Sequence, residues 1–454
     1  MGFHDKYDIA IVGGGIAGLY CCMQADPDKK VALFESTSRI GGRIETVSME
    51  GFNAEYGAMR FDPLKQLMTG KLIQDMGLET ETFHEYSCPT IQNRRTVYNL
   101  EEYEKELTTI DLVTFAIQRI LNKSREQIFS MTEEELEHIR REGKYNGEYL
   151  WKQGLWNIFS DVLSYDALKY IIMDGTFFHF VQENPNIDWM INWIKMLQMS
   201  KGLKGIKHGM QRITDSMFEK AKEKGVEVYK NHTLAAIMPS GKDEVALFFE
   251  NHRTFSARHV VLAIPQRSLK SIKNIPENIK KLLESVMEIP LLKCFFVVKT
   301  PWWEQDITNE GLIPFPAREL HYSKKFGKGN IMVYADRPYI NFWSRYVNAE
   351  NHEEAEICGD KELPLMFARR MNIDPGNIVM YGIRDWSRDP YGAACHLWRP
   401  GVQSWKVREK FEAFSLSEDG PKNVHICGEA FSDYQGFMEG SVRSAHNVMN
   451  KIQI

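Results

Sequence analysis

The sequence lacks several features that would place it in a specialised class of protein. It has no run of 18 apolar residues and no basic-then-apolar leader, so we expect neither a membrane span nor a signal peptide. Its 56 basic and 61 acidic residues nearly cancel, and this balance gives no indication of nucleic-acid binding. Seven cysteines without C-x-x-C spacing indicate no zinc site and no disulfide framework. We therefore expect a reduced, cytoplasmic protein without a bound metal.

The start of the chain carries a nucleotide-binding pattern. Residues 9–12 form a short apolar run typical of a buried parallel strand. Three glycines follow as G-x-G-x-x-G, namely Gly13, Gly15 and Gly18. They permit a tight turn, the close approach of a pyrophosphate and close packing of the next helix. A second apolar strand ends at Glu35, where a carboxylate can bind a ribose hydroxyl. The pattern predicts a bound dinucleotide.

A segment after this second strand resembles a known family. From Glu35 to Arg43 the sequence reads E-x-x-x-R-x-G-G-R. Together with the glycine motif, this resembles the flavin amine oxidase superfamily, whose members hold FAD. Within this superfamily, the chain resembles the bacterial L-amino-acid oxidase branch and is similar to tryptophan oxidases of indole-pigment pathways. The Gly41-Gly42 turn positions Arg43, whose planar guanidinium can pair with a pyrophosphate.

The next segment bears on the substrate class. Gly57-Ala58-Met59-Arg60 resembles the G-x-M-R segment that passes the flavin ring in amino-acid oxidases. The resemblance implies that Arg60 grips the substrate carboxylate, because a bidentate pair supplies both energy and orientation. Amine and polyamine oxidases need no arginine at this place. A structural ion pair is the alternative role for Arg60.

Two residues of the second half match catalytic positions of the family. An apolar strand over residues 289–298 is interrupted by Lys293, and a buried lysine is costly unless it is hydrogen-bonded or functional. The resemblance implies that Lys293 holds a water against flavin N5 and aids the reaction with oxygen. A lysine snorkelling at a strand edge is the alternative. Tyr322 matches a tyrosine that adds a second carboxylate contact, and a sheet aromatic is its alternative role.

Trp386 and Cys395 match positions beside the flavin. An aromatic residue at the place of Trp386 flanks the flavin face in relatives. Cys395 follows at the spacing at which monoamine oxidases carry a cysteine joined covalently to the flavin. Amino-acid oxidases bind FAD without such a bond, which favours a small buried cysteine and non-covalent FAD. A covalent link at Cys395 stays the alternative.

The last motif joins a strand that ends at Gly428-Glu429 to a helix that begins near Gly436. The resemblance implies that Glu429 contacts the ribityl-phosphate region of FAD. Gly436 would offer a carbonyl to the substrate amine, and Phe437 a ring beside the flavin. The helix dipole favours negative charge on the reduced ring. The backbone of Val228 is expected to meet the adenine.

These assignments define the expected site. The catalytic residues are Lys293, Arg60, Tyr322, Trp386, Phe437 and Gly436. The cofactor-binding residues are Gly13, Gly15, Ile16, Ala17, Gly18, Glu35, Ser36, Gly42, Arg43, Gly57, Ala58, Met59, Arg60, Val228, Trp386, Gly428, Glu429, Gly436, Phe437 and Met438.

The predicted fold class is α/β, in two or three packed units because 454 residues exceed one hydrophobic core. A Rossmann-type FAD-binding domain, a mixed-sheet substrate-binding domain and a helical lobe are expected. Their ranges are 1–60, 205–285 and 420–454 for the first, 61–100 and 286–419 for the second, and 101–204 for the lobe. Within the lobe, Thr132 and Glu135 form a capping-box pattern.

The resemblance implies FAD-dependent oxidative deamination of L-amino acids, with a broad or aromatic-preferring range. Hydride would pass from Cα to flavin N5, and the products would be a 2-oxo acid, ammonia and hydrogen peroxide. The expected partners are an amino acid and molecular oxygen, without nucleic acid or membrane, and a homodimer is left open. An amine or polyamine oxidase and a flavin dehydrogenase that does not use oxygen are the alternatives.

Overall fold

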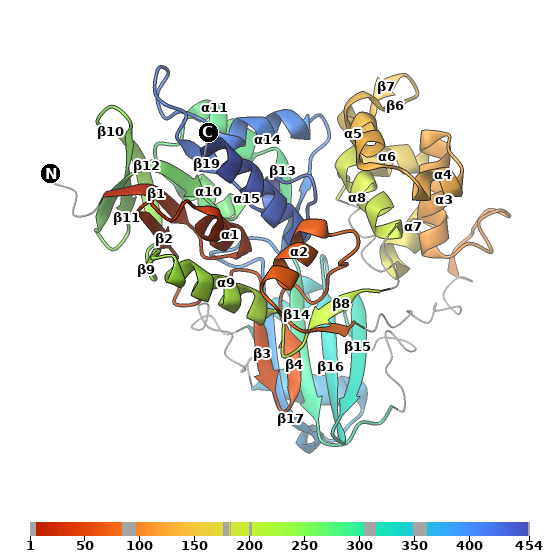
Figure 1. The fold of residues 1–454 in the computed structure, drawn as a ribbon. Helices are drawn as coiled ribbons and strands as arrows, with labels where there is room; N and C mark the ends of the chain where they lie inside the picture. Colours follow the sequence, from red (N-terminus) through yellow and green to blue (C-terminus); the bar gives the residue numbers. More distant parts are fainter. Residues whose placement is uncertain are drawn as a thin grey trace.

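The structure is a computed structural model that describes residues 6–83, 97–175, 181, 183–198, 202–303, 315–347 and 361–452. Figure 1 shows three parts, which are a sheet flanked by helices, a smaller sheet below it and a helical lobe to one side. Within the described ranges, no helix combines the length and apolar character needed to cross a bilayer.

The largest sheet has seven strands. In spatial order six of them are β10 (Leu234–Ser240), β11 (Glu244–Phe249), β12 (Thr254–Leu262), β1 (Lys6–Val12), β2 (Val31–Phe34) and β9 (Glu227–Tyr229). The seventh, β19 (Val424–Ile426), pairs with the carboxyl-terminal half of β12. Strands β19, β12, β1, β2 and β9 are parallel, whereas β10 and β11 are antiparallel.

Helices cover both faces of this sheet because its central strands are apolar on both faces. On β1, Ile9 and Ile11 face one core, while Ala10 and Val12 face the other. The first core includes α1 (Ile16–Gln24), α9 (Gln211–Glu223) and α15 (Met438–Ile452). The second includes α10 (Gln266–Ser271), α11 (Glu277–Leu283) and α14 (Ser404–Glu412). This architecture confirms the predicted α/β fold class with a Rossmann-type domain.

The smaller sheet is antiparallel, in the order β15 (Glu319–Lys325), β16 (Lys328–Ala335), β14 (Leu292–Val298) and β17 (Ile378–Asp385). Its outer face packs on α12 (Ile340–Trp343) and α13 (Glu362–Met371). Its inner face packs on the hairpin of β3 (Thr46–Met49) and β4 (Phe52–Glu55).

Short elements join these parts. Two strand pairs lie between the sheets, β13 (Val286–Ile289) with β18 (Cys395–Trp398) and β5 (Thr80–Thr82) with β8 (Lys204–Ile206). Helix α2 (Leu67–Asp75) packs against α15.

The lobe is mainly helical. Its elements are α3 (Thr109–Leu121), α4 (Arg125–Phe129), α5 (Glu133–Glu142), the hairpin β6 (Lys144–Tyr145) and β7 (Glu148–Tyr149), α6 (Leu155–Ser160), α7 (Tyr165–Asp174) and α8 (Ile187–Leu197). The Thr132 hydroxyl accepts from the Glu135 N–H, which confirms the predicted capping box at α5.

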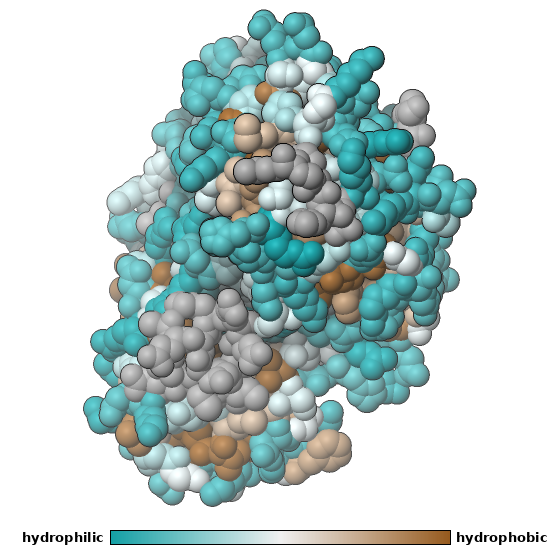
Figure 2. All heavy atoms as spheres, turned by 90° about the vertical axis from the view of Figure 1, so that its left-hand side faces the viewer, coloured by the Kyte–Doolittle hydropathy of each residue, from teal (hydrophilic) through white to brown (hydrophobic). Residues whose placement is uncertain are grey.

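The seven-stranded sheet draws all its strands from ranges 1–60, 205–285 and 420–454, and the four-stranded sheet lies within 286–419. The domain boundaries themselves stay a prediction. On the face drawn in Figure 2, hydrophilic residues predominate and hydrophobic ones form separate patches. Such scattered apolar residues are ordinary for a surface in contact with water.

Candidate active site

A large cavity lies at the carboxyl ends of the parallel strands. Its volume is about 770 Å³, and it reaches from the seven-stranded sheet past the four-stranded sheet to α8. Val12 at the end of β1, Lys293 on β14 and Trp189 on α8 all line it. All three parts of the molecule therefore contribute walls, at the place where α/β folds commonly bind ligands.

Most of the predicted site residues line this one cavity. They are Gly13, Gly15, Ile16, Ala17, Glu35, Ser36, Gly42, Arg43, Gly57, Ala58, Met59, Arg60, Lys293, Trp386, Gly428, Glu429, Gly436, Phe437 and Met438. Three predicted residues, Gly18, Val228 and Tyr322, are not part of its lining.

The glycine motif shapes one end of the cavity. Gly13 has a φ of +108°, and a Cβ there would lie 2.4 Å from the Ala263 carbonyl oxygen, so only glycine fits. A Cβ at Gly18 would lie 1.9 Å from the Gly13 carbonyl oxygen. Gly18 therefore serves the close packing of α1 and not the lining itself, which explains its absence from the wall.

Glu35 is held in a fixed orientation beside the glycines. Its Oε2 accepts from the Gly14 N–H at 2.7 Å, and its Oε1 accepts from the Thr37 N–H at 2.9 Å. The carboxylate is buried and lines the cavity. This placement is the one that a ribose-binding acid requires.

The segment beyond β9 takes the place expected for Val228. Val228 pairs with Leu33 within the sheet and packs on the core around α1, away from the cavity. The cavity is instead lined by His232, Thr233 and Leu234, which follow the end of the strand. The predicted contact between the Val228 backbone and the adenine was therefore wrong. Ligands of such folds meet the end of a parallel strand and the loop after it, whereas Val228 lies in the middle of β9.

Arg43 and Glu429 form an ion pair in the cavity wall. Arg43 Nη1 lies 2.9 Å from Glu429 Oε2 and donates to the Ala394 carbonyl at 2.6 Å. Burial disfavours the charged form of Glu429, but Arg43 and His396 outweigh burial and lower the pKa of Glu429 to about 2. Glu429 Oε1 also accepts from the Gly436 N–H at 2.9 Å, so this carboxylate positions the loop before α15.

Polar side chains cross the four-stranded sheet in one row. Glu319, Tyr334, Lys293 and Arg384 are directly opposite one another on β15, β16, β14 and β17. Directly opposite residues of antiparallel strands share a face. Lys293 and Tyr334 line the cavity, whereas Glu319 is buried and pairs with His321 at 2.7 Å.

Lys293 anchors the segment that leads to Arg60. It lies on an inner strand and is only 3% exposed, which excludes a lysine snorkelling at a sheet edge. Its Nζ donates to the carbonyls of Glu55 at 2.9 Å and Gly57 at 2.7 Å, and lies 3.4 Å from Met59 Sδ. Burial lowers the pKa of Lys293 to about 7, although the nearby Glu55 opposes this shift.

Arg60 lies at the end of this anchored segment. Its side chain lines the cavity, and its guanidinium stacks over the Phe83 ring with 5.2 Å to the centroid. The charge of Arg60 also acts on Lys293 and Tyr334. A planar cation supported by a ring and a fixed backbone is suited to grip a carboxylate.

The cavity tyrosine is Tyr334 and not Tyr322. Tyr322 lies on the opposite face of the four-stranded sheet, 5.0 Å from the Trp303 ring centroid in the core around α13. The difference follows from register, because Glu319 pairs with Tyr334 and successive residues of β15 alternate between faces. The prediction that Tyr322 contacts the substrate carboxylate was therefore wrong.

Trp386 and Cys395 both line the cavity. The Trp386 Nε1 donates to the Tyr56 carbonyl at 2.7 Å, which fixes the indole against the segment before Arg60. Cys395 is buried, and burial raises the pKa of its thiol. A Cβ at Gly436 would lie 4.0 Å from Cys395 Cβ, so the two are neighbours.

Helix α8 supplies wall residues that sequence reasoning missed. Trp189, Asn192 and Met196 line the cavity, and their spacing places them on one helix face. The sequence predicts the helix, and its polar residues Asp188, Asn192 and Lys195 recur at helical spacing. Every residue from Ile187 to Lys195 is nevertheless buried, so this polar stripe does not mark a solvent-exposed face, and the sequence does not show which face meets the cavity.

These residues fit an FAD molecule. At the nucleotide end, Gly15 is the N-cap of α1 and makes no side-chain cap bond, which leaves the first N–H groups of the helix for a phosphate. Gly42 faces Gly15 with no side chain between them, since a Cβ on Gly15 would lie 3.7 Å from Gly42 Cα. Glu35 and Arg43 add a ribose acceptor and a pyrophosphate donor.

Comparisons with known proteins agree with this geometry. The model of the flavin containing amine oxidoreductase family matches residues 22–452. An uncharacterized protein of Acanthamoeba polyphaga mimivirus is 23% identical over 98% of this chain and 94% of its own. The L-amino acid oxidase bordonein-L of Crotalus durissus terrificus is 22% identical over 96% of this chain and 85% of its own.

Solved structures of redesigned putrescine oxidase variants show a similar fold. One has a TM-score of 0.65 and 16% sequence identity, and covers 99% of each chain. The likeness at this identity concerns the fold alone. The family match confirms the expected flavin cofactor, FAD, and an oxidoreductase activity. The chain thus belongs to the flavin-containing amine oxidoreductase family.

Proposed function

We propose that the protein is an FAD-dependent L-amino-acid oxidase. The observation that carries this proposal is Arg60, a cation in the cavity wall held by the segment that Lys293 anchors. A substrate carboxylate would be drawn from water into a site that already presents the matching charge. The L-amino-acid oxidase relatives, at 22% identity, support the same substrate class.

The charges of the cavity also favour an anionic substrate group. The acidic residues of the described lining are Glu35, Glu250, Asp389 and Glu429. Glu35 and Glu250 lie near the nucleotide end, Asp389 pairs with Arg267 at 3.4 Å, and Glu429 pairs with Arg43. In the described lining, no carboxylate remains to hold the second ammonium of a polyamine beside Arg60.

In this proposal the chain's own residues bind and orient the substrate. Arg60 holds the carboxylate, and Tyr334 adds a hydroxyl on the same wall. The apolar surroundings favour the neutral amine, whose lone pair is needed as Cα–H leaves. FAD supplies hydride acceptance and the passage of electrons to oxygen, and the imine hydrolyses to a 2-oxo acid and ammonia. Lys293 positions the Glu55-to-Arg60 segment and donates its hydrogen bonds there.

Two other activities are distinguishable from this one. An amine oxidase would act on substrates without a carboxylate, as the fold likeness to putrescine oxidase would allow. A dehydrogenase would reduce its flavin with the same substrate but consume no oxygen. To distinguish an amine oxidase, the purified holoprotein is mixed anaerobically with L-amino acids, D-amino acids and amines, and flavin bleaching shows which of them reduce the flavin. To distinguish a dehydrogenase, an oxygen electrode measures whether oxygen is consumed during turnover.

Replacing Arg60 by Met is expected to lower kcat/KM for L-amino acids about 100-fold, close to 2.7 kcal/mol, because a buried charge pair is lost. Arg60→Lys keeps the charge but not the planar fork and should lose less. Reduction by simple amines serves as the control and should not fall. Unchanged amino-acid kinetics in Arg60→Met, or an equal loss with amines, would contradict the carboxylate role.

A further inference from the structure

We propose that His396 is a positioning residue for FAD and that it acts through the Glu429 carboxylate. The inference rests on the cofactor that the family match supplies and not on the proposed substrate. His396 lies on β18 between Cys395 and Leu397, which both line the cavity, while His396 is fully buried and outside the lining. Because successive side chains of a strand point to opposite faces, the imidazole lies behind the cavity wall.

Four donors hold the Glu429 carboxylate in an arrangement that we call the Glu429 clamp. Oε1 accepts from the backbone N–H groups of His396 and Gly436, each at 2.9 Å. Oε2 accepts from Arg43 Nη1 at 2.9 Å and from His396 Nδ1 at 3.0 Å. A carboxylate has about four acceptor positions, so the chain itself occupies them. In this inference Glu429 therefore serves FAD through the residues that it holds.

Arg43 and Gly436 are the members of the clamp that, with Glu429, line the cavity. Arg43 directly follows Gly42, which faces Gly15 at the start of α1, and its planar guanidinium is suited to a pyrophosphate. Gly436 has a φ of +84° in the loop before α15, a conformation that the bond from its N–H to Glu429 helps to hold. A displaced Glu429 would therefore shift a cofactor donor and a part of the cavity backbone together.

The bond from Nδ1 to Glu429 is the one polar contact of the His396 ring in the part of the chain that the structure describes. A carboxylate only accepts, so the proton of this bond lies on Nδ1. Nε2 is buried and has no hydrogen-bond partner among the described residues. Both side chains are buried, so water does not readily replace a missing Nδ1 donor. The polar role of the ring is therefore to hold this carboxylate.

Removal of the Nδ1 donor is expected to weaken the binding of FAD. Glu429 Oε2 would then keep Arg43 Nη1 as its one donor within the clamp, and a buried carboxylate with an open acceptor position draws its remaining cation more strongly. The guanidinium would turn toward Glu429 and away from the pyrophosphate that it is expected to bind. The loss of a hydrogen bond to a charged group corresponds to roughly 10-fold in an equilibrium constant, or more.

The test compares His396→Asn with His396→Leu, because the two new side chains have nearly the same size and shape. The asparagine Nδ2 donates toward Glu429 in place of the histidine Nδ1, whereas leucine has no donor. Stepwise dilution of the purified holoprotein, followed by the fluorescence of released flavin, gives the Kd of FAD. We expect this Kd to be about 10-fold above wild type for His396→Leu and within about 3-fold for His396→Asn. His396→Phe, which keeps a ring without a donor, should behave as His396→Leu does.

Two controls separate this role from a general loss of stability. His425→Leu replaces another buried histidine, which lies on β19 outside the cavity lining, and should leave the Kd of FAD within about 3-fold of wild type. In a Glu429→Met background, His396→Leu and His396→Asn should bind FAD equally well, because the carboxylate on which their difference depends is gone.

A Kd for His396→Leu that stays near the wild-type value would overturn the inference. Equal weakening by His396→Asn and His396→Leu would overturn it as well, since the packing of the ring and not its donor would then matter. So would a loss in His425→Leu as large as that in His396→Leu, or a difference between the two His396 variants that persists in the Glu429→Met background. None of these measurements uses an amino acid, so their outcome is independent of the proposed function.

Discussion

Lys293 shows how one side chain couples the four-stranded sheet to the cavity. Burial lowers its pKa to about 7, and its hydrogen bonds go to the backbone that leads to Arg60. Glu55 lies half-buried beside it, and desolvation raises the pKa of Glu55 to about 7 as well. A cavity-wall lysine and a neighbouring carboxyl that both have pKa values near 7 make this region sensitive to pH.

The lowered pKa of Lys293 predicts a specific pH dependence of stability. Between pH 7 and 10.5 the unfolded chain holds a proton on this lysine that the folded chain does not, so the free energy of unfolding rises with pH. Lys293→Met removes this contribution. The variant's stability relative to wild type should therefore be highest near pH 7 and fall toward pH 10, as measured by urea unfolding at several pH values.

The control for this measurement is Lys71→Met, on the exposed face of α2. Its difference from wild type should stay constant over the same pH range. A constant difference for Lys293→Met would show that burial does not depress the pKa of this lysine.

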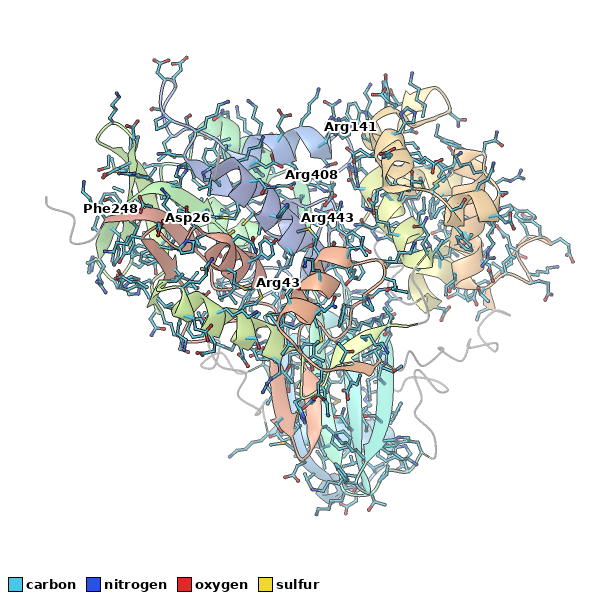
Figure 3. The ribbon with its side chains drawn as sticks, viewed as in Figure 1. Asp26, Arg43, Arg141, Phe248, Arg408 and Arg443 are labelled. Carbon is cyan, nitrogen blue, oxygen red and sulfur yellow. The ribbon has the colours of Figure 1, made fainter. Side chains whose placement is uncertain are left out.

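At the scale of elements, a cluster of buried and half-buried ion pairs joins the lobe to the helices of the FAD-binding region. Arg140 Nε on α5 lies 2.7 Å from Asp188 Oδ1 on α8, and Arg443 Nη2 on α15 lies 2.6 Å from Asp433 Oδ2. Arg408 on α14 is 3.9 Å from Asp433. Figure 3 shows Arg408 and Arg443 along the boundary with the lobe. The cluster holds α8 beside the loop before α15.

Arg140→Met is expected to destabilise the protein by about 3 kcal/mol, because it leaves Asp188 as a buried charge without its cation. Arg141→Met is the matched control, since Arg141 is exposed and bonds the same Glu137 from the next position of α5. That change should stay within about 0.5 kcal/mol. Urea unfolding measures both, and equal effects would contradict a structural role specific to the buried pair.

At the scale of the whole molecule, FAD binding and folding are linked because the cavity takes walls from the two sheets and the lobe. A ligand that binds the folded chain alone stabilises it by mass action, by about 2.7 kcal/mol at 100 times its Kd. Burial keeps the Cys395 thiol protonated by raising its pKa, and a protonated thiol is a poor nucleophile. This argues for a cofactor held without a covalent bond.

Acid precipitation should therefore release all flavin into the supernatant. The flavin-free protein should have a lower Tm, which added FAD restores. Absorbance of the supernatant and differential scanning calorimetry give the two readings. Yellow colour that stays with the precipitate would contradict the non-covalent state, and an unchanged Tm would contradict the linkage.

The sequence alone predicted the site residues whose type is fixed by the local backbone. Gly13, Gly15 and Glu35 could be predicted because a tight turn, the start of a helix and an acid at a set distance each require a particular residue type at a particular position. Lys293 stood out because a lysine within an apolar strand is rare. These residues all line the cavity.

Tertiary structure alone decided which distant residues complete the wall. Tyr334 and not Tyr322 faces the cavity because the pairing of β15 with β16 fixes which side of each strand points inward. Likewise, the burial of α8 on nearly all sides leaves only its packing partners to choose the face that carries Asn192. Register and helix rotation are set by contacts between segments far apart in sequence, and no local pattern encodes them.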